Sequence, residues 1–84
     1  MKTVLVIHDE RHIVRLCQVN LERQGYQVVI SDASGAVEAA TACAATMIAL
    51  DSTTVSGAQA LRALLDDPTT NEIPIFQIPA TPWR

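Results

Sequence analysis

The sequence has few of the features that mark nucleic-acid-binding, membrane and secreted proteins. Its 84 residues carry six lysines and arginines against nine acids, a net charge of −3. They show no basic face of the kind that binds nucleic acid. No apolar run approaches the ~20 residues that a membrane-crossing helix needs. The stretch Met1 to Ile7 is too short for a signal peptide, and Asp9 and Glu10 follow at once. We therefore expect a cytoplasmic protein that binds neither nucleic acid nor a membrane.

Cysteine is also scarce. Cys17 and Cys43 lie among apolar residues at helical spacing, so we interpret them as buried free thiols. No CxxC or Cys/His spacing indicates a zinc site. Arg11, Arg15 and Arg23 lie in one helical stretch, where a solvated helix face is favoured over a phosphate-binding stripe.

The residues that are present predict a packed α/β domain. Hydrophobic residues make up 49% of the chain, which excludes a disordered tail. Apolar runs rich in β-branched residues are typical of strands in a parallel sheet, and they alternate with stretches of helical periodicity. We predict strands over 3–7, 26–30, 46–50 and 73–78, and helices over about 10–24, about 35–44 and from 57 to 66. This alternation implies a parallel sheet with helices on both faces.

Turn and capping residues mark the ends of these elements. Gly25 is expected to stop the first helix, and Asp32 to act as a cap in the loop before the second. The segment from Ser56 to Gln59 matches a capping box, with Ser56 as the cap of the third helix. Pro68 is expected to end that helix, because proline cannot continue the hydrogen-bond ladder.

Two acids follow predicted strands directly: Asp9 follows the first and Asp51 the third. In an open parallel sheet, ligands bind at this edge, where the strand order reverses. If these strands are neighbours, the carboxylates converge and repel, and a divalent cation such as Mg²⁺ would relieve the repulsion. One carboxylate could also act as a nucleophile towards a phosphoryl group. A helix cap is a full alternative for Asp9, and a strand-end acid that starts a loop is the alternative for Asp51.

Six segments carry a shared pattern in their order and spacing: Val4–Glu10, 12–16, 21–26, Ile48–Asp51, 60–64 and 73–75. Along essentially the whole chain this pattern resembles the receiver domains of bacterial response regulators. In that resemblance Val4–Glu10 is the first strand and acid pair, 12–16 and 21–26 are the first helix and second strand, Ile48–Asp51 is the strand that delivers the phospho-accepting aspartate, and 60–64 and 73–75 are the third helix and fourth strand. The resemblance implies one domain over residues 1–84. Its fold would be a three-layer, flavodoxin-like (CheY-like) open parallel sheet of about four strands in the order 2-1-3-4, with three helices. The last strand and last two helices of a receiver would be missing.

The resemblance also implies roles for single residues. Asp51 would accept a phosphoryl group from a histidine kinase or a phosphotransfer protein. Asp9, Asp51 and the backbone carbonyl of Thr53 would ligate Mg²⁺, which makes weakly bound Mg²⁺ the expected cofactor.

Three positions depart from the receiver pattern. His8 replaces the first acid of the pair, which removes a negative charge and weakens the expected metal site; neutral drift is favoured over a designed ligand there. The loop after Asp51 is shorter than usual. Pro79 stands where receivers carry a switch Thr or Ser, and proline has no hydroxyl to follow a phosphoryl oxygen. His12 is interpreted as a solvated helix residue.

These patterns favour a receiver-like signalling domain of a two-component or phosphorelay system, a pseudo-receiver that works mainly through protein contacts and is not an enzyme in the ordinary sense. A phosphorylatable, Mg²⁺-dependent switch is the first alternative. A small flavodoxin-like enzyme or nucleotide binder is the alternative of another class, but the chain lacks a glycine-rich phosphate loop after the first strand. Because the strand over 73–78 would leave an apolar edge, we expect a homodimer.

Overall fold

Strands and helices alternate along the chain, as the sequence predicts. The computed structural model describes residues 2–78, so the expected departure at Pro79 lies outside the described residues. Within this range the elements are β1 (Thr3–Ile7), α1 (Arg11–Arg23), β2 (Gln27–Ser31), α2 (Ala36–Ala42), β3 (Met47–Leu50), α3 (Val55–Asp66) and β4 (Ile75–Gln77). None of the helices in this range is long and apolar enough to cross a bilayer.

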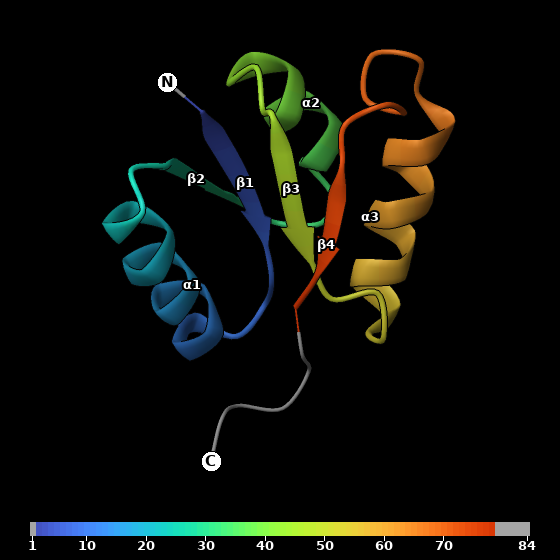
Figure 1. The fold of residues 1–84 in the computed structure, drawn as a ribbon. Helices are drawn as coiled ribbons and strands as arrows, with labels where there is room; N and C mark the ends of the chain where they lie inside the picture. The colour runs from blue at the N-terminus through green and yellow to red at the C-terminus, as the bar shows by residue number, and fades with distance from the viewer. Residues whose placement is uncertain (1, 79–84) are drawn as a thin grey trace.

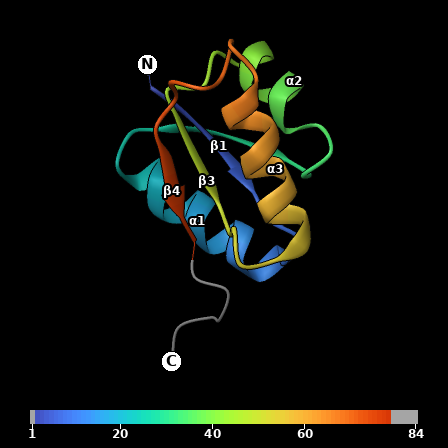
Figure 2. The ribbon, with the colours of Figure 1, turned by 90° about the vertical axis from the view of Figure 1, so that its right-hand side faces the viewer.

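The strands form one parallel sheet in the order β2-β1-β3-β4 (Figure 1), which confirms the predicted order 2-1-3-4. α1 lies on one face of this sheet, and α2 and α3 lie on the other (Figure 1 and Figure 2). The predicted three-layer arrangement is therefore confirmed.

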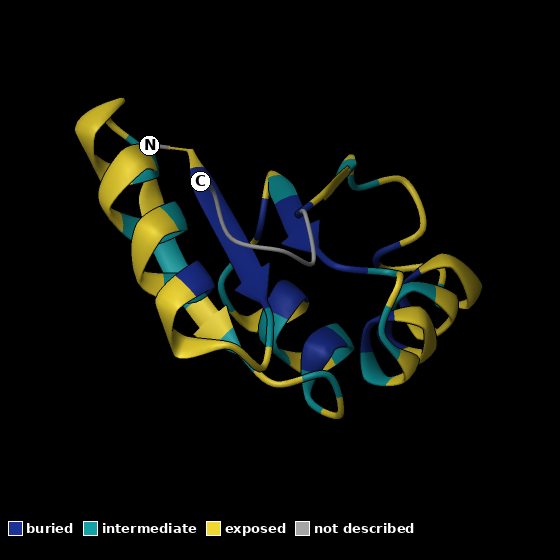
Figure 3. Ribbon diagram, turned by 90° about the horizontal axis from the view of Figure 1, so that it is seen from below, coloured by how far each residue is buried: buried dark blue, intermediate teal, exposed yellow. Residues whose placement is uncertain are grey.

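Successive side chains of β1 point to opposite faces of the sheet, and they contribute to two separate apolar layers of the core. Val4 and Val6 pack with Ile13 on the α1 side of the sheet. Leu5 and Ile7 belong to the other layer, whose buried members also include Leu64 of α3. Every residue of β1 is buried, as expected for a central strand of a parallel sheet covered on both faces. Figure 3 shows these buried central strands between helices whose outer sides are exposed.

Within residues 2–78, the cover over the α1 face of the sheet is incomplete. Beside α1, over β3 and β4, lies an open hollow of about 380 Å³. Its lining is mostly apolar and includes Ile13, Leu16, Cys17, Leu21, Tyr26, Met47, Ala49, Phe76 and Ile78. Both cysteines are free, as predicted, but they are half-buried rather than fully buried. Burial raises the pKa of the Cys17 thiol.

Three residues predicted to mark element ends, Gly25, Asp32 and Pro68, do so, although most element bounds differ from the predicted ones by one or more residues. Gly25 follows α1 with a φ of 93°, the left-handed region that favours glycine. The carboxylate of Asp32 accepts the N–H of Gly35 at 2.9 Å. α3 ends at Asp66, shortly before Pro68. α2 ends earlier than predicted, and Ala44 just after it has a φ of 51°. β4 is also shorter than the predicted strand over 73–78.

The prediction that Ser56 caps the third helix is wrong. α3 already begins at Val55, so Ser56 lies in its first turn. The cap is Thr54, whose extended backbone precedes the helix and whose hydroxyl oxygen accepts the N–H of Gly57 at 2.9 Å. Both threonine and serine can cap a helix, and the tertiary path of the loop decided between them.

Candidate functional site

The candidate site lies where β1 and β3 end side by side, at the lower edge of the sheet in Figure 1. Ile7 and Leu50 are paired as the last residues of these strands, so His8 and Asp51 follow them at neighbouring positions. Edges of this kind, at the carboxyl ends of parallel strands where the strand order reverses, are where open α/β sheets bind ligands.

Asp51 is a buried carboxylate that is held by its own loop. Its side chain is 2% exposed. Its Oδ1 accepts the N–H of Thr53 at 2.9 Å and the hydroxyl of Thr53 at 2.5 Å. The Thr53 hydroxyl, the Thr53 N–H and the neighbouring His8 lower the pKa of Asp51 from its ordinary value, against an opposing effect of burial. Asp51 is therefore ionised at neutral pH.

His8 faces the other oxygen of Asp51. Its side chain is 4% exposed, and its Nε2 lies 3.6 Å from Oδ2 of Asp51. Its Nδ1 accepts the N–H of Glu10 at 2.9 Å. An imidazole nitrogen that accepts a hydrogen bond carries no proton, so the ring proton is assigned to Nε2. Nε2 of His8 and Oδ2 of Asp51 are both buried and have no hydrogen-bond partner among the described residues.

Asp9 contacts α3 and does not cap α1. Its Oδ2 accepts the hydroxyl of Ser56 at 2.9 Å, which connects the loop after β1 to the first turn of α3. Glu10 is the N-cap residue of α1 and makes no side-chain capping bond. The alternative role of Asp9 as a helix cap is therefore wrong. The sequence did not indicate this contact, because it joins residues that lie 47 positions apart.

The first turn of α3 closes the site from the side opposite β1. Gly57 is buried against Asp51, and a Cβ at this position would overlap the carbonyl carbon and oxygen of Asp51. A cavity of about 10 Å³ lies between His8, Asp9, Asp51 and the start of α3. This volume is about that of one water-sized probe. The need for glycine at position 57 was not visible in the sequence, since it depends on how closely α3 approaches the end of β3.

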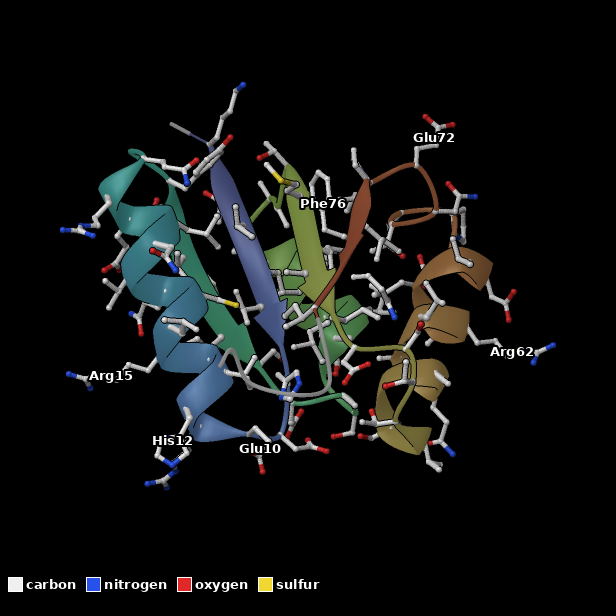
Figure 4. All side chains as sticks on the ribbon, turned by 60° about the horizontal axis from the view of Figure 1, so that its bottom comes forward. Glu10, His12, Arg15, Arg62, Glu72 and Phe76 are labelled. Atoms are coloured by element: carbon white, nitrogen blue, oxygen red, sulfur yellow. The ribbon has the colours of Figure 1, made fainter. Side chains whose placement is uncertain are left out.

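The polar residues of α1 lie outside the site. His12 and Arg15 point away from the sheet in Figure 4, and Arg11 and Arg23 are exposed as well. These positions confirm the predictions of a solvated histidine and a solvated helix face.

The donor atoms fit Mg²⁺ poorly. Mg²⁺ takes oxygen ligands in near-octahedral geometry and usually keeps several waters. Here one oxygen of Asp51 is bound by Thr53, the other faces an imidazole N–H, and an oxygen of Asp9 accepts the Ser56 hydroxyl. Within residues 2–78, no three His, Cys, Asp or Glu side chains gather closely enough to hold a metal ion.

Comparison with known proteins identifies the fold. No protein-family model and no curated protein matches the chain. Among solved structures, it is similar to the N-terminal domain of a response regulator receiver protein from Methanoculleus marisnigri JR1, with a TM-score of 0.85 and 29% sequence identity. The match covers 100% of this chain and 71% of that one. The chain therefore has the fold and strand order of the N-terminal part of a response-regulator receiver domain, which is a signalling module rather than an enzyme in the ordinary sense.

Proposed function

We propose that the chain is a receiver-like signalling domain of a two-component or phosphorelay system, that it works in the cytoplasm, and that it acts mainly through contacts with other proteins. The observation that carries this proposal is the state of Asp51, which stands at the phospho-acceptor position. Both of its carboxylate oxygens face donors from the same chain, Thr53 and His8. A phosphoryl group would add three oxygens and a charge near −2, and the cavity beside Asp51 is only about the size of one water. Asp51 is thus a structural carboxylate that stabilises the loop after β3.

Incubation with acetyl phosphate and Mg²⁺, followed by measurement of the intact mass, tests this proposal. We expect no phosphoryl adduct, either in the native chain or in the Asp51→Asn variant, while a receiver domain with both acids serves as the positive control. A phosphoryl adduct that the native chain forms and Asp51→Asn does not would overturn the proposal. It would support the second candidate, a Mg²⁺-dependent switch that uses Asp9, Asp51 and the Thr53 carbonyl and takes its phosphoryl group from a histidine kinase or phosphotransfer protein.

The hollow beside α1 supports protein contacts as the mode of action. Phe76 of β4 and Leu16 of α1 both line this hollow, and they are 53% and 38% exposed. β4 is an edge strand of the described sheet, paired with β3 on one side. An apolar hollow next to a strand edge that can still pair favours association. We propose that a second copy of the chain covers this face.

Sedimentation equilibrium over the micromolar range tests the proposed homodimer. We expect a monomer–dimer equilibrium with concentration-dependent mass. A mass that stays at the monomer value throughout this range would contradict the dimer. In that case, a different protein would be the expected partner for the same face.

A further inference from the structure

Two buried polar atoms at the carboxyl edge of the sheet lack conventional hydrogen-bond partners among the described residues: Nε2 of His8 and Oδ2 of Asp51. They face one another at 3.6 Å, slightly beyond the usual range of an N–H···O bond. The cavity beside them has a volume of about 10 Å³, about that of one water-sized probe. Among the described residues each of the two atoms faces the other as a possible partner, and a shift of less than an ångström would join them.

The orientation of the His8 ring is set from its far side. The backbone N–H of Glu10 points at Nδ1 at 2.9 Å, so Nδ1 must present a lone pair and Nε2 must carry the proton. The ring therefore directs a donor at Asp51. The same tautomer excludes Nε2 as a metal ligand, because a metal-bound imidazole nitrogen has no proton and the other nitrogen then carries the N–H.

We propose that His8 acts as an internal substitute for a divalent cation and makes the site independent of metal. Its Nε2–H group takes the oxygen of Asp51 that a cation would otherwise bind. Thr53 takes the other oxygen, and the Ser56 hydroxyl takes an oxygen of Asp9. Each acid at this edge is then satisfied by a donor of the chain itself, and the remaining cavity of about 10 Å³ leaves no room for a cation with its waters. His8 is the residue that decides whether this edge binds a divalent cation.

This inference uses the position of Asp51 assigned in the proposed function, but it can be tested without any phosphoryl donor. The probe is Mn²⁺, followed by electron paramagnetic resonance, with Mg²⁺ as a competitor. We expect no saturable binding to the native chain in the low millimolar range. The His8→Asp variant restores an all-oxygen acid pair, and we expect it to bind Mn²⁺ about tenfold more tightly or better, since a second carboxylate close to the first favours a cation.

His12→Asp is the matched control. It makes the same change of residue and charge at an exposed position of α1, four residues from His8 along the chain. We expect it to bind Mn²⁺ no better than the native chain. Native binding as tight as that of His8→Asp would overturn the inference, and so would a folded His8→Asp variant that gains no binding over His12→Asp.

A measurement on the native chain covers the case in which His8→Asp does not fold. The ¹⁵N chemical shifts of the His8 ring distinguish a protonated Nε2 from a protonated Nδ1. We expect the Nε2–H form, with shifts that millimolar Mg²⁺ leaves unchanged. A ring protonated at Nδ1, or Nε2 shifts that move on addition of the cation, would overturn the inference. Because acetyl phosphate is absent from these experiments, their outcome is separate from the phosphorylation test.

Discussion

Asp51 and Asp67 make the same local hydrogen bonds, although only Asp51 lies in the candidate site. In each case Oδ1 accepts the N–H and the hydroxyl of the threonine two residues later, Thr53 or Thr69. In each case the threonine hydroxyl is the first cause of a lowered aspartate pKa. The Asp-x-Thr turn is thus a local structure that recurs where the sequence repeats. What distinguishes Asp51 is its burial next to His8.

This pair of turns allows a controlled test of the acid at the site. The folded-state pKa of Asp51 is lowered, so its contribution to stability is present above the unfolded pKa near pH ~4 and is lost as the pH falls through the folded pKa. We expect Thr53→Val to lower the free energy of unfolding at neutral pH, and its difference from the native chain to shrink as the solution is acidified. Urea unfolding at a series of pH values measures this. Thr69→Val removes hydrogen bonds to Asp67 that lie at the surface, and it should show a smaller difference because solvent screens the interaction. An equal loss of unfolding free energy in the two variants would mean that the burial of Asp51 does not strengthen its hydrogen bonds to Thr53.

Gly57 shows how a single missing side chain positions the site. A Cβ there would overlap the Asp51 carbonyl, and backbone atoms cannot move aside as a flexible side chain can. We expect Gly57→Ala to lower the free energy of unfolding by about 1–3 kcal/mol, in spite of the better helix propensity of alanine. Chemical denaturation checks this. Gln59→Ala, at an exposed position of the same helix, should stay within about 0.5 kcal/mol of the native chain. A Gly57→Ala variant that is more stable than the native chain would show that α3 does not approach Asp51 this closely.

At the scale of the element, the start of α3 joins the loop after β3 to the loop after β1. Thr54 satisfies the N–H of Gly57 within the helix, whereas Ser56 donates its hydroxyl outward to Asp9. One side chain therefore stabilises the helix, and the other stabilises its position against the neighbouring loop.

Substitution separates these two roles. We expect Thr54→Ala to cost about 1 kcal/mol of stability, because it leaves a helix N–H without its cap. Ser56→Ala should cost no more than about 0.5 kcal/mol, since the bond that it removes lies at the surface. Thermal or urea unfolding of the two variants gives the comparison. A larger loss of stability in Ser56→Ala than in Thr54→Ala would indicate that Ser56, and not Thr54, caps the helix.

At the scale of the whole molecule, the two faces of the sheet are covered unequally. Within residues 2–78, α2 and α3 lie together on one face and α1 is the one helix on the other (Figure 2). A hollow beside α1, over β3 and β4, stays open. The proposed dimer follows from this asymmetry, because burial of apolar surface is the main force that drives association.

Two exposed apolar residues test where the dimer forms. Phe76 lines the hollow and is 53% exposed, and Leu65 on α3 is 51% exposed and does not line it. We expect Phe76→Lys to raise the dissociation constant of the dimer about tenfold or more, because it places a charge in an apolar contact and on a strand edge. Sedimentation equilibrium measures the constant. Leu65→Lys should leave it unchanged, and a larger effect of Leu65→Lys would move the interface to the α3 face.

Local sequence was enough to predict the order and type of the elements and the placing of Asp9 and Asp51 at strand ends. The spacing of hydrophobic residues, and helix-ending residues such as Gly25 and Pro68, affect the structure over only a few residues. The sequence is therefore enough to predict their effects on helices and strands. Only the tertiary structure decided the details of the site: the direction in which His8 points its N–H, the Ser56–Asp9 contact, and the approach of α3 that requires Gly57. Each of these depends on residues brought together from separate strands, helices or loops, or on the backbone path of a turn, and periodicity contains no information about such distances.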